Sequence, residues 1–129
     1  MNLTSFPQIV VFKRLPKGVL ARYMERAKPR RIELTPDILA YERRTQMQIA
    51  LHEIGHWFRN EHVARSEMKD EESFARDFVS YFLIEKQFKR EKPERHQQFA
   101  EWLSGQRGRI RAFARKCLSQ LAASANGAS

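Results

Sequence analysis

Residues 52–62 read HEIGHWFRNEH and hold three of the four histidines in this chain of 129 residues. His52 and His56 are four positions apart, so on an α-helix their side chains project from one face, one turn from each other. The surrounding residues support a helix, because apolar side chains recur there at the spacing of a buried helical face. These side chains are Met47, Leu51, Ile54 and Phe58. We therefore expect a helix over residues 37–59, with a break near Tyr41.

Two neutral imidazoles on one helical face can bind a zinc ion. Glu53 lies between the two histidines, displaced around the helix, where its carboxylate can act as general base toward a water molecule that zinc activates. Gly55 is costly inside a helix, by up to about 1 kcal/mol relative to alanine, and we expect it to allow close approach of a neighbouring backbone. The motif predicts a catalytic zinc site with Glu53 as the catalytic residue. A hydroxyl that stabilises the oxyanion can come from Tyr23, Tyr41 or Tyr81, which the sequence does not rank.

A catalytic zinc site takes a third protein ligand, and the sequence offers several candidates. His62 follows His52 by ten residues, a spacing that occurs in metzincins. Glu72 opens the next predicted helix beside its apolar stripe, and the small Ala75 one turn later lets that helix pack closely against the histidine helix. We expect Glu72 to be the third ligand, with Glu71 and His62 as the alternatives.

The run RIELTPDILAYERRTQMQIALHEIGHWF, followed by a helix of pattern E-x-x-A-x-x-F, resembles the ImmA/IrrE family of small zinc-dependent metallopeptidases. The resemblance covers residues 31–84. It implies that His52 and His56 are metal ligands, that Glu53 is the general base and that Glu72 is a gluzincin-type third ligand. It also implies an α+β fold, a small zincin-like domain that is mostly helical with a short β-sheet next to the HExxH helix.

The same resemblance implies a zinc metallopeptidase of narrow specificity. Its expected substrate is a protein partner, such as a helix-turn-helix transcriptional repressor of a mobile element, a phage or a stress response. The chain has no room for a DNA-binding domain beside the catalytic core, so we expect the repressor to be a separate protein. The alternatives are a non-catalytic basic module on a zincin-like fold that binds nucleic acid or protein, and a structural protein of a phage or mobile element.

Short patterns predict the elements around the motif. Residues 8–12 and 31–34 read as strands, the first β-branched and the second alternating in polarity. Residues 17–28 read as a helix, because five apolar side chains fall on one helical face. Thr35 and Asp70 are placed to cap the helices that follow them.

The last part of the chain predicts two more helices, over residues 94–103 and 109–122. Residues 60–69 and 104–108 are expected to be connections between helices. We expect a single domain over residues 1–122 and a disordered tail over residues 123–129.

The chain has a formal net charge of +9, and no acidic residue follows Glu101. A field of this sign favours encounter with nucleic acid or with an acidic protein. The charge is dense in residues 105–117, GQRGRIRAFARKC. The favoured interpretation is a helix packed on the core with its basic side chains in solvent. The alternative is nucleic-acid binding, with possible contacts from Arg107, Arg109, Arg111, Arg115 and Lys116.

No window approaches the roughly twenty apolar residues of a membrane-spanning helix. The first residues lack the charged start, apolar run and cleavage site of a signal peptide. Cys117 is the only cysteine, which excludes an internal disulfide and fits a reducing compartment. We therefore expect a soluble, cytoplasmic protein without membrane association.

Overall fold

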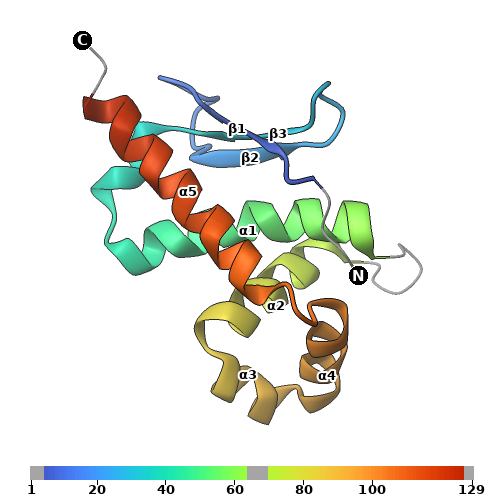
Figure 1. Ribbon diagram of the computed structural model, residues 1–129. Helices are drawn as coiled ribbons and strands as arrows, with labels where there is room; N and C mark the ends of the chain where they lie inside the picture. The colour runs from blue at the N-terminus through green and yellow to red at the C-terminus, as the bar shows by residue number, and fades with distance from the viewer. Residues whose placement is uncertain (1–4, 64–69, 127–129) are drawn as a thin grey trace.

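The computed structural model describes residues 5–63 and 70–126. These residues form an α+β fold that is mostly helical and contains a three-stranded sheet (Figure 1). The strands are β1 (Gln8–Val11), β2 (Ala21–Met24) and β3 (Arg31–Leu34). The helices are the 3₁₀ helix η1 (Pro36–Ala40), α1 (Arg43–His62), α2 (Glu71–Leu83), α3 (Glu85–Glu91), α4 (Pro93–Trp102) and α5 (Arg107–Asn126).

The sheet has the strand order β1-β3-β2, with β1 parallel and β2 antiparallel to the central strand. Ile32 and Leu34 of the central strand are fully buried, as the predicted alternation requires. Helix α1 packs against β2, and α5 packs against β1 and η1. In Figure 1 the sheet lies over α1, while α5 crosses in front of both. Helix α1, which carries the histidines, therefore lies beneath β2, and the basic helix α5 lies on the side of β1.

The predicted helix over residues 17–28 is wrong, because this segment holds strand β2. Gly18 has a φ of 82°, a left-handed conformation that starts a turn and not a helix. The Thr35 N–H then donates to the Leu20 carbonyl oxygen at 3.0 Å, which begins the antiparallel ladder with β3. Only four residues pair in β2, and over so short a run an apolar pattern does not separate a strand from a helix.

Most other predicted elements are confirmed. The predicted break near Tyr41 separates η1 from α1, and Thr35 caps η1 by accepting from the Asp37 N–H. Helix α1 runs to His62, three residues into the predicted connection. Helix α5 runs to Asn126, so the prediction of a disordered tail is wrong for residues 123–126. Residues 127–129 of that tail and residues 64–69 of the predicted connection lie outside the described part of the chain.

An aromatic core joins α1, α2, α3 and α4. Phe58 of α1 stacks with Phe74 of α2 and packs at a tilt against Phe78. The ring centroids of Phe74 and Phe99 of α4 are 5.1 Å apart. All four side chains are fully buried. Burial of aromatic rings on this scale is a main source of stability in a small domain. Helix α2, which carries the predicted third ligand, is therefore held against α1 by the core itself.

Gly55 lies where α1 and α2 approach most tightly around this core. A Cβ built at this position falls 3.2 Å from the Cβ and ring atoms of Phe78. The predicted close approach is present, but the neighbour is this aromatic side chain and not a backbone. Gly55 thus sets the spacing between the helix that carries the histidines and the helix that carries Glu72.

Among the described residues, none of the helices is both long enough and apolar enough to cross a lipid bilayer.

Candidate metal centre

Helices α1 and α2 bring His52, His56 and Glu72 together. The Nε2 atoms of the two histidines are 3.3 Å apart. Glu72 reaches them with different oxygens, Oε2 at 3.3 Å from His52 Nε2 and Oε1 at 3.1 Å from His56 Nε2. Within residues 5–63 and 70–126, this is the group of His, Cys, Asp and Glu side chains whose donor atoms converge closely enough to hold a metal ion.

The donor set fits zinc. Two donors that each lie about 2.0–2.1 Å from a tetrahedral zinc ion are separated by roughly 3.3–3.4 Å, which is close to the separation of the two histidine nitrogens. Glu72 presents a different oxygen to each histidine, at 3.3 and 3.1 Å. Burial lowers the pKa of His52, and the neighbouring charge of His56 lowers it further. The ring is therefore held in the neutral form that binds metals. The Glu72 side chain is 66% exposed, so the site is open to solvent on the α2 side.

Glu53 lies on α1 beside the two histidines, and its carboxylate is hydrogen-bonded to the sheet. The Tyr23 backbone N–H donates to Glu53 Oε1 at 3.0 Å, and this bond leaves the other carboxylate oxygen for chemistry. Burial raises the pKa of Glu53 to about 7, although the hydrogen bond from Tyr23 favours the charged form. A bound cation would favour the charged form as well, since opposite charges at this range stabilise each other.

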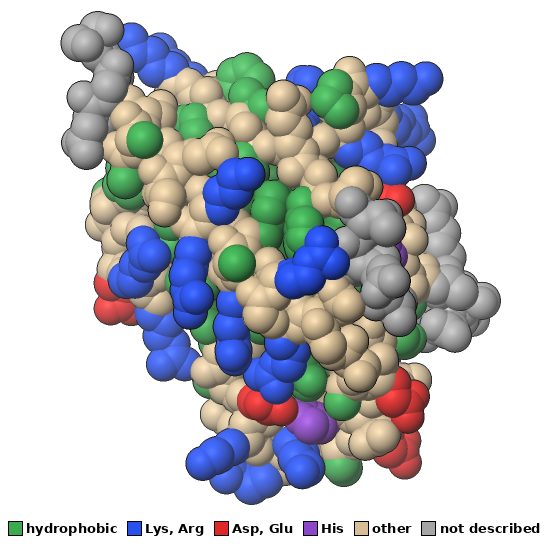
Figure 2. All heavy atoms as spheres, viewed as in Figure 1, with side chains coloured by type: hydrophobic (Ala, Val, Ile, Leu, Met, Phe, Trp, Pro, Cys, Tyr) green, Lys and Arg blue, Asp and Glu red, His purple; other side chains and the backbone are tan. Residues whose placement is uncertain are grey.

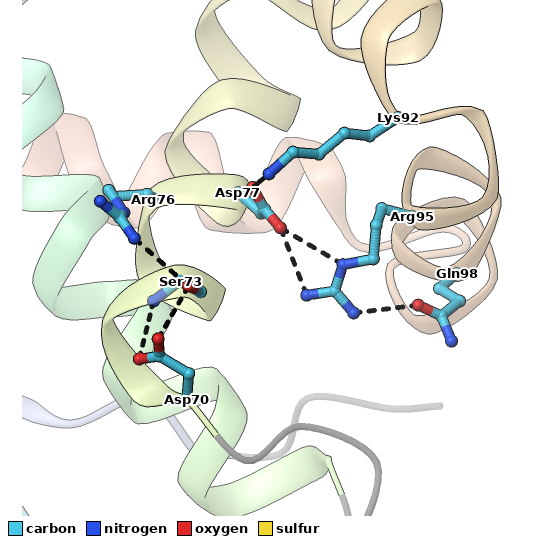
Figure 3. Close-up of polar contacts among 7 residues, drawn as sticks. All are labelled: Asp70, Ser73, Arg76, Asp77, Lys92, Arg95 and Gln98. Carbon is cyan, nitrogen blue, oxygen red and sulfur yellow. Dashed lines mark hydrogen bonds and ion pairs between the residues drawn. The ribbon is translucent and has the colours of Figure 1, made fainter.

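The N-terminus of α2 is fixed by its cap, as predicted for Asp70. Asp70 Oδ1 accepts from the backbone N–H of Glu72 at 3.0 Å and from that of Ser73 at 3.2 Å (Figure 3). The Ser73 hydroxyl donates to Asp70 Oδ2, and Arg76 donates in turn to Ser73 Oγ. Because Glu72 lies within this capped turn, its backbone has a defined position next to the histidines.

A second contact fixes the middle of α2. Asp77 is buried and accepts from Lys92 Nζ at 2.9 Å and from Arg95 Nε at 3.2 Å (Figure 3). Arg95 also donates to Gln98 Oε1 of the same helix. Lys92 and Arg95 lie at the start of α4, so these ion pairs tie α2 to the α3–α4 unit. The ion pairs of Asp77 with Lys92 and Arg95 were not predicted, because the paired residues are far apart in sequence.

The two alternative ligands lie elsewhere. Glu71 Oε1 accepts from Nη1 of the buried Arg59 at 2.7 Å, and its carboxylate does not belong to the converging group of His52, His56 and Glu72. The His62 ring packs at the end of α1 against Trp57 and Phe58, at centroid distances of 5.3 and 5.4 Å. Of the three candidate ligands, Glu72 is therefore the one whose carboxylate lies beside the two histidines, as expected.

Of the three candidate tyrosines, Tyr23 borders the site. It lines a cavity of about 240 Å³ together with Glu53 and His56. Its hydroxyl is buried next to Asn60, and burial raises the pKa of this group above the ordinary value of 10.0. Tyr41 is exposed after η1, while Tyr81 is buried in the aromatic core beneath Arg107.

A second cavity, of about 450 Å³, opens on the other side of Glu53. Its lining is mainly aliphatic and includes Val19, Leu20 and Ile49, with His52 and Glu53 at its border. The smaller cavity is lined by charged and polar side chains instead, among them Arg22 and Glu71. Glu53 therefore stands between an apolar space and a charged one.

Comparison of the chain with protein-family models, with curated proteins and with solved structures finds no match.

Proposed function

We propose that this protein is a zinc-dependent metallopeptidase built on a zincin-like fold. The observation that supports the proposal most is the convergence of His52, His56 and Glu72 at donor separations of 3.1–3.3 Å, with Glu53 on the same helix. Three protein ligands and a solvent-exposed side are the arrangement of a catalytic zinc site, whereas structural zinc sites are closed by a fourth ligand.

A zinc ion held by these residues would supply Lewis acidity, polarising the scissile carbonyl and making water a better nucleophile near neutral pH. Glu53 accepts the proton of the attacking water on its free carboxylate oxygen and delivers it to the leaving amine nitrogen. The bond from the Tyr23 N–H keeps the carboxylate oriented during both transfers. Tyr23 also lines the cavity beside Glu53 and His56, but its hydroxyl is buried next to Asn60, so the oxyanion role expected of a tyrosine is not assigned to it.

The two cavities beside Glu53 suggest how a peptide lies in the site. An apolar side chain on one side of the scissile bond would fill the space lined by Val19, Leu20 and Ile49. The residue on the other side would meet Arg22 and Glu71. This contrast favours a peptidase of narrow specificity over a general one.

For the partner we propose a helix-turn-helix repressor, on the ground of the motif resemblance to the ImmA/IrrE family. The location we propose is the cytoplasm. Cys117 is fully buried, and burial raises the pKa of its thiol to about 12. A single protected thiol is compatible with a reducing compartment, where most intracellular repressors act.

The test compares wild type with Glu53→Gln and His52→Ala. Zinc content is measured by mass spectrometry of the purified protein, and hydrolysis with a pool of synthetic peptides of random sequence and with the candidate repressor. We expect Glu53→Gln to keep its zinc and lose hydrolysis by about 10²–10⁴-fold, and His52→Ala to lose both. Full activity in Glu53→Gln, or wild-type protein without bound zinc, contradicts the proposal.

A further inference from the structure

Helix α5 separates the five predicted basic contacts into two groups. Arg107 and Arg111 are half-buried and serve the fold, since Arg107 pairs with Glu85 at 3.0 Å and lies over the Tyr81 ring. Arg109, Arg115 and Lys116 are exposed. Within residues 5–63 and 70–126, none of these three forms an ion pair with an acidic side chain.

The exposed basic residues lie on one face of the helix. Arg109 and Lys116 are seven residues apart, about 10 Å along the helix axis, which corresponds to roughly three base-pair rises of a duplex. Arg109 is held over the Phe6 ring at 5.6 Å, which restricts its side chain before any ligand arrives. Figure 2 shows Lys and Arg side chains gathered over the face that α5 crosses, while Asp and Glu side chains lie toward its margins and lower part.

The other exposed positions on this face of α5 include several small residues. The exposed positions of the same face include Gly108, Ala112, Ser119, Ala122 and Ala123. Small side chains let a ligand approach the helix closely, but they offer none of the aromatic or large aliphatic anchors that carry protein–protein interfaces. A surface with charge and without anchors fits a polyanion bound by its regularly spaced charges more than it fits an acidic protein.

We propose that the exposed face of α5, defined by Arg109, Arg115 and Lys116, binds the phosphate backbone of nucleic acid without reading its sequence. Guanidinium groups pair with phosphate oxygens in a bidentate manner, and the lysine adds a point charge. This surface lies on the β1 side of α1, whereas the metal centre lies between α1, β2 and α2. Binding there does not depend on the proposed peptidase activity and is measured without it.

The experiment measures fluorescence anisotropy of a short labelled DNA duplex of arbitrary sequence, and of an RNA hairpin, between about 50 and 200 mM salt. A polyglutamate peptide serves as the acidic-protein probe. The test variant carries Arg109→Gln, Arg115→Gln and Lys116→Gln. The matched control carries Lys17→Gln, Arg26→Gln and Lys28→Gln, at three exposed residues in the connections between strands. These substitutions lower the net charge by the same amount as those of the test variant.

We expect the test variant to lose at least about tenfold in affinity and to reduce the slope of log K against log salt by about 3, one per lost phosphate contact. The control should stay close to wild type. Arg115→Gln alone should reduce the slope by about 1, which gives a reading even if the triple variant is poorly folded. If the protein binds one of the two probes more strongly, that probe, DNA or RNA, identifies the nucleic acid that supplies the phosphates. Equal losses in both triple variants, or tighter binding to polyglutamate than to either nucleic acid, overturns the proposal.

Discussion

Glu72 is the residue of the candidate site whose position depends most on its neighbours. Its own side chain is largely exposed, so little packing holds the carboxylate in place. The capped turn at Asp70 and the ion pair between Arg59 and Glu71 fix the backbone that leads into it. The adjacent glutamates therefore have different partners on α1, Glu72 facing the two histidines and Glu71 pairing with Arg59.

These different partners predict that the two glutamates differ in their effect on metal binding. Glu72→Gln should weaken zinc affinity by about 10–100-fold or more, because it removes a charged ligand. Glu71→Gln should leave zinc affinity within a few-fold of wild type and act mainly on stability. Competition with a chromophoric chelator measures both. Equal loss of affinity in the two variants would mean that Glu71 shares the ligand role.

At the scale of single residues, the sequence was sufficient to predict interactions between residues that are close together in the chain. His52 and His56 follow from the helical repeat, and the Asp70 cap follows from its place before an apolar helix. The bond from the Tyr23 N–H to Glu53 was not predictable, because its partners are thirty residues apart and belong to elements whose packing no single-sequence pattern encodes.

Among the elements, the strand β2 shows where sequence patterns fail. Val19, Leu20, Tyr23 and Met24 have the spacing of one helical face, and only two of them, Tyr23 and Met24, belong to the strand. Pairing with β3 and the turn at Gly18 decide in favour of the strand. The long helices α1 and α5 were predictable because their apolar repeats extend over several turns.

The close contact at Gly55 gives a prediction about helix spacing. Gly55→Ala places a methyl group 3.2 Å from Phe78, which is buried among other aromatic rings and cannot move aside. Overpacking of about 1–3 kcal/mol should exceed the helix-propensity gain of up to about 1 kcal/mol. We expect lower stability and weaker zinc binding, since α2 must shift together with Glu72.

The control for this variant is Gly108→Ala in α5, where a Cβ meets nothing within 4 Å. This change should raise stability slightly and leave zinc binding unaltered. Urea denaturation and chelator competition on both variants provide the comparison. A gain of stability in Gly55→Ala would show that α1 and α2 are less tightly packed than the structure indicates.

The sheet contains a buried acid whose titration links stability to pH. Glu33 of β3 accepts from Arg22 Nε and Arg31 Nε, each at 2.6 Å. Burial acts to raise the pKa of Glu33, but the hydrogen bonds and charges of the two arginines together hold it below its ordinary value of 4.5. A carboxyl with a lowered pKa in the folded state stabilises above pH 4.5, and this contribution is lost as pH falls through the folded-state pKa.

We therefore expect Glu33→Gln to lower the free energy of unfolding by about 1–3 kcal/mol at pH 7. The difference from wild type should shrink as the pH falls well below 4.5, where the wild-type carboxyl also becomes neutral. Urea denaturation at a series of pH values measures the effect, with the exposed Glu101→Gln as control. A difference that does not change with pH would assign the loss to packing alone.

Across the whole molecule, the candidate site connects two parts of the fold. Helix α1 packs against β2 and α5, and α2 is tied to α3 and α4 by the Asp77 ion pairs, while α1 and α2 share the aromatic core. Histidines from one part and a glutamate from the other surround the same point. A metal ion at this point would cross-link the two parts.

This arrangement predicts that zinc stabilises the fold as well as the site. At free zinc about 100 times its dissociation constant, the free energy of unfolding should rise by about 2.7 kcal/mol, provided that the unfolded chain does not bind the ion. Thermal unfolding with and without a chelator measures the change. His52→Ala should show no such response, and an equal response in that variant would place the bound zinc elsewhere.

The bond between Glu53 and the Tyr23 amide also bears on how the protein behaves at high concentration. Strand β2 borders the sheet on one side, and its Tyr23 N–H points away from β3 toward Glu53. Free amides along such a border recruit strands from other chains and start aggregation. Glutamine at position 53 retains an oxygen that can accept this bond, whereas alanine does not. We therefore expect Glu53→Ala to be less soluble than Glu53→Gln, a difference unrelated to catalysis.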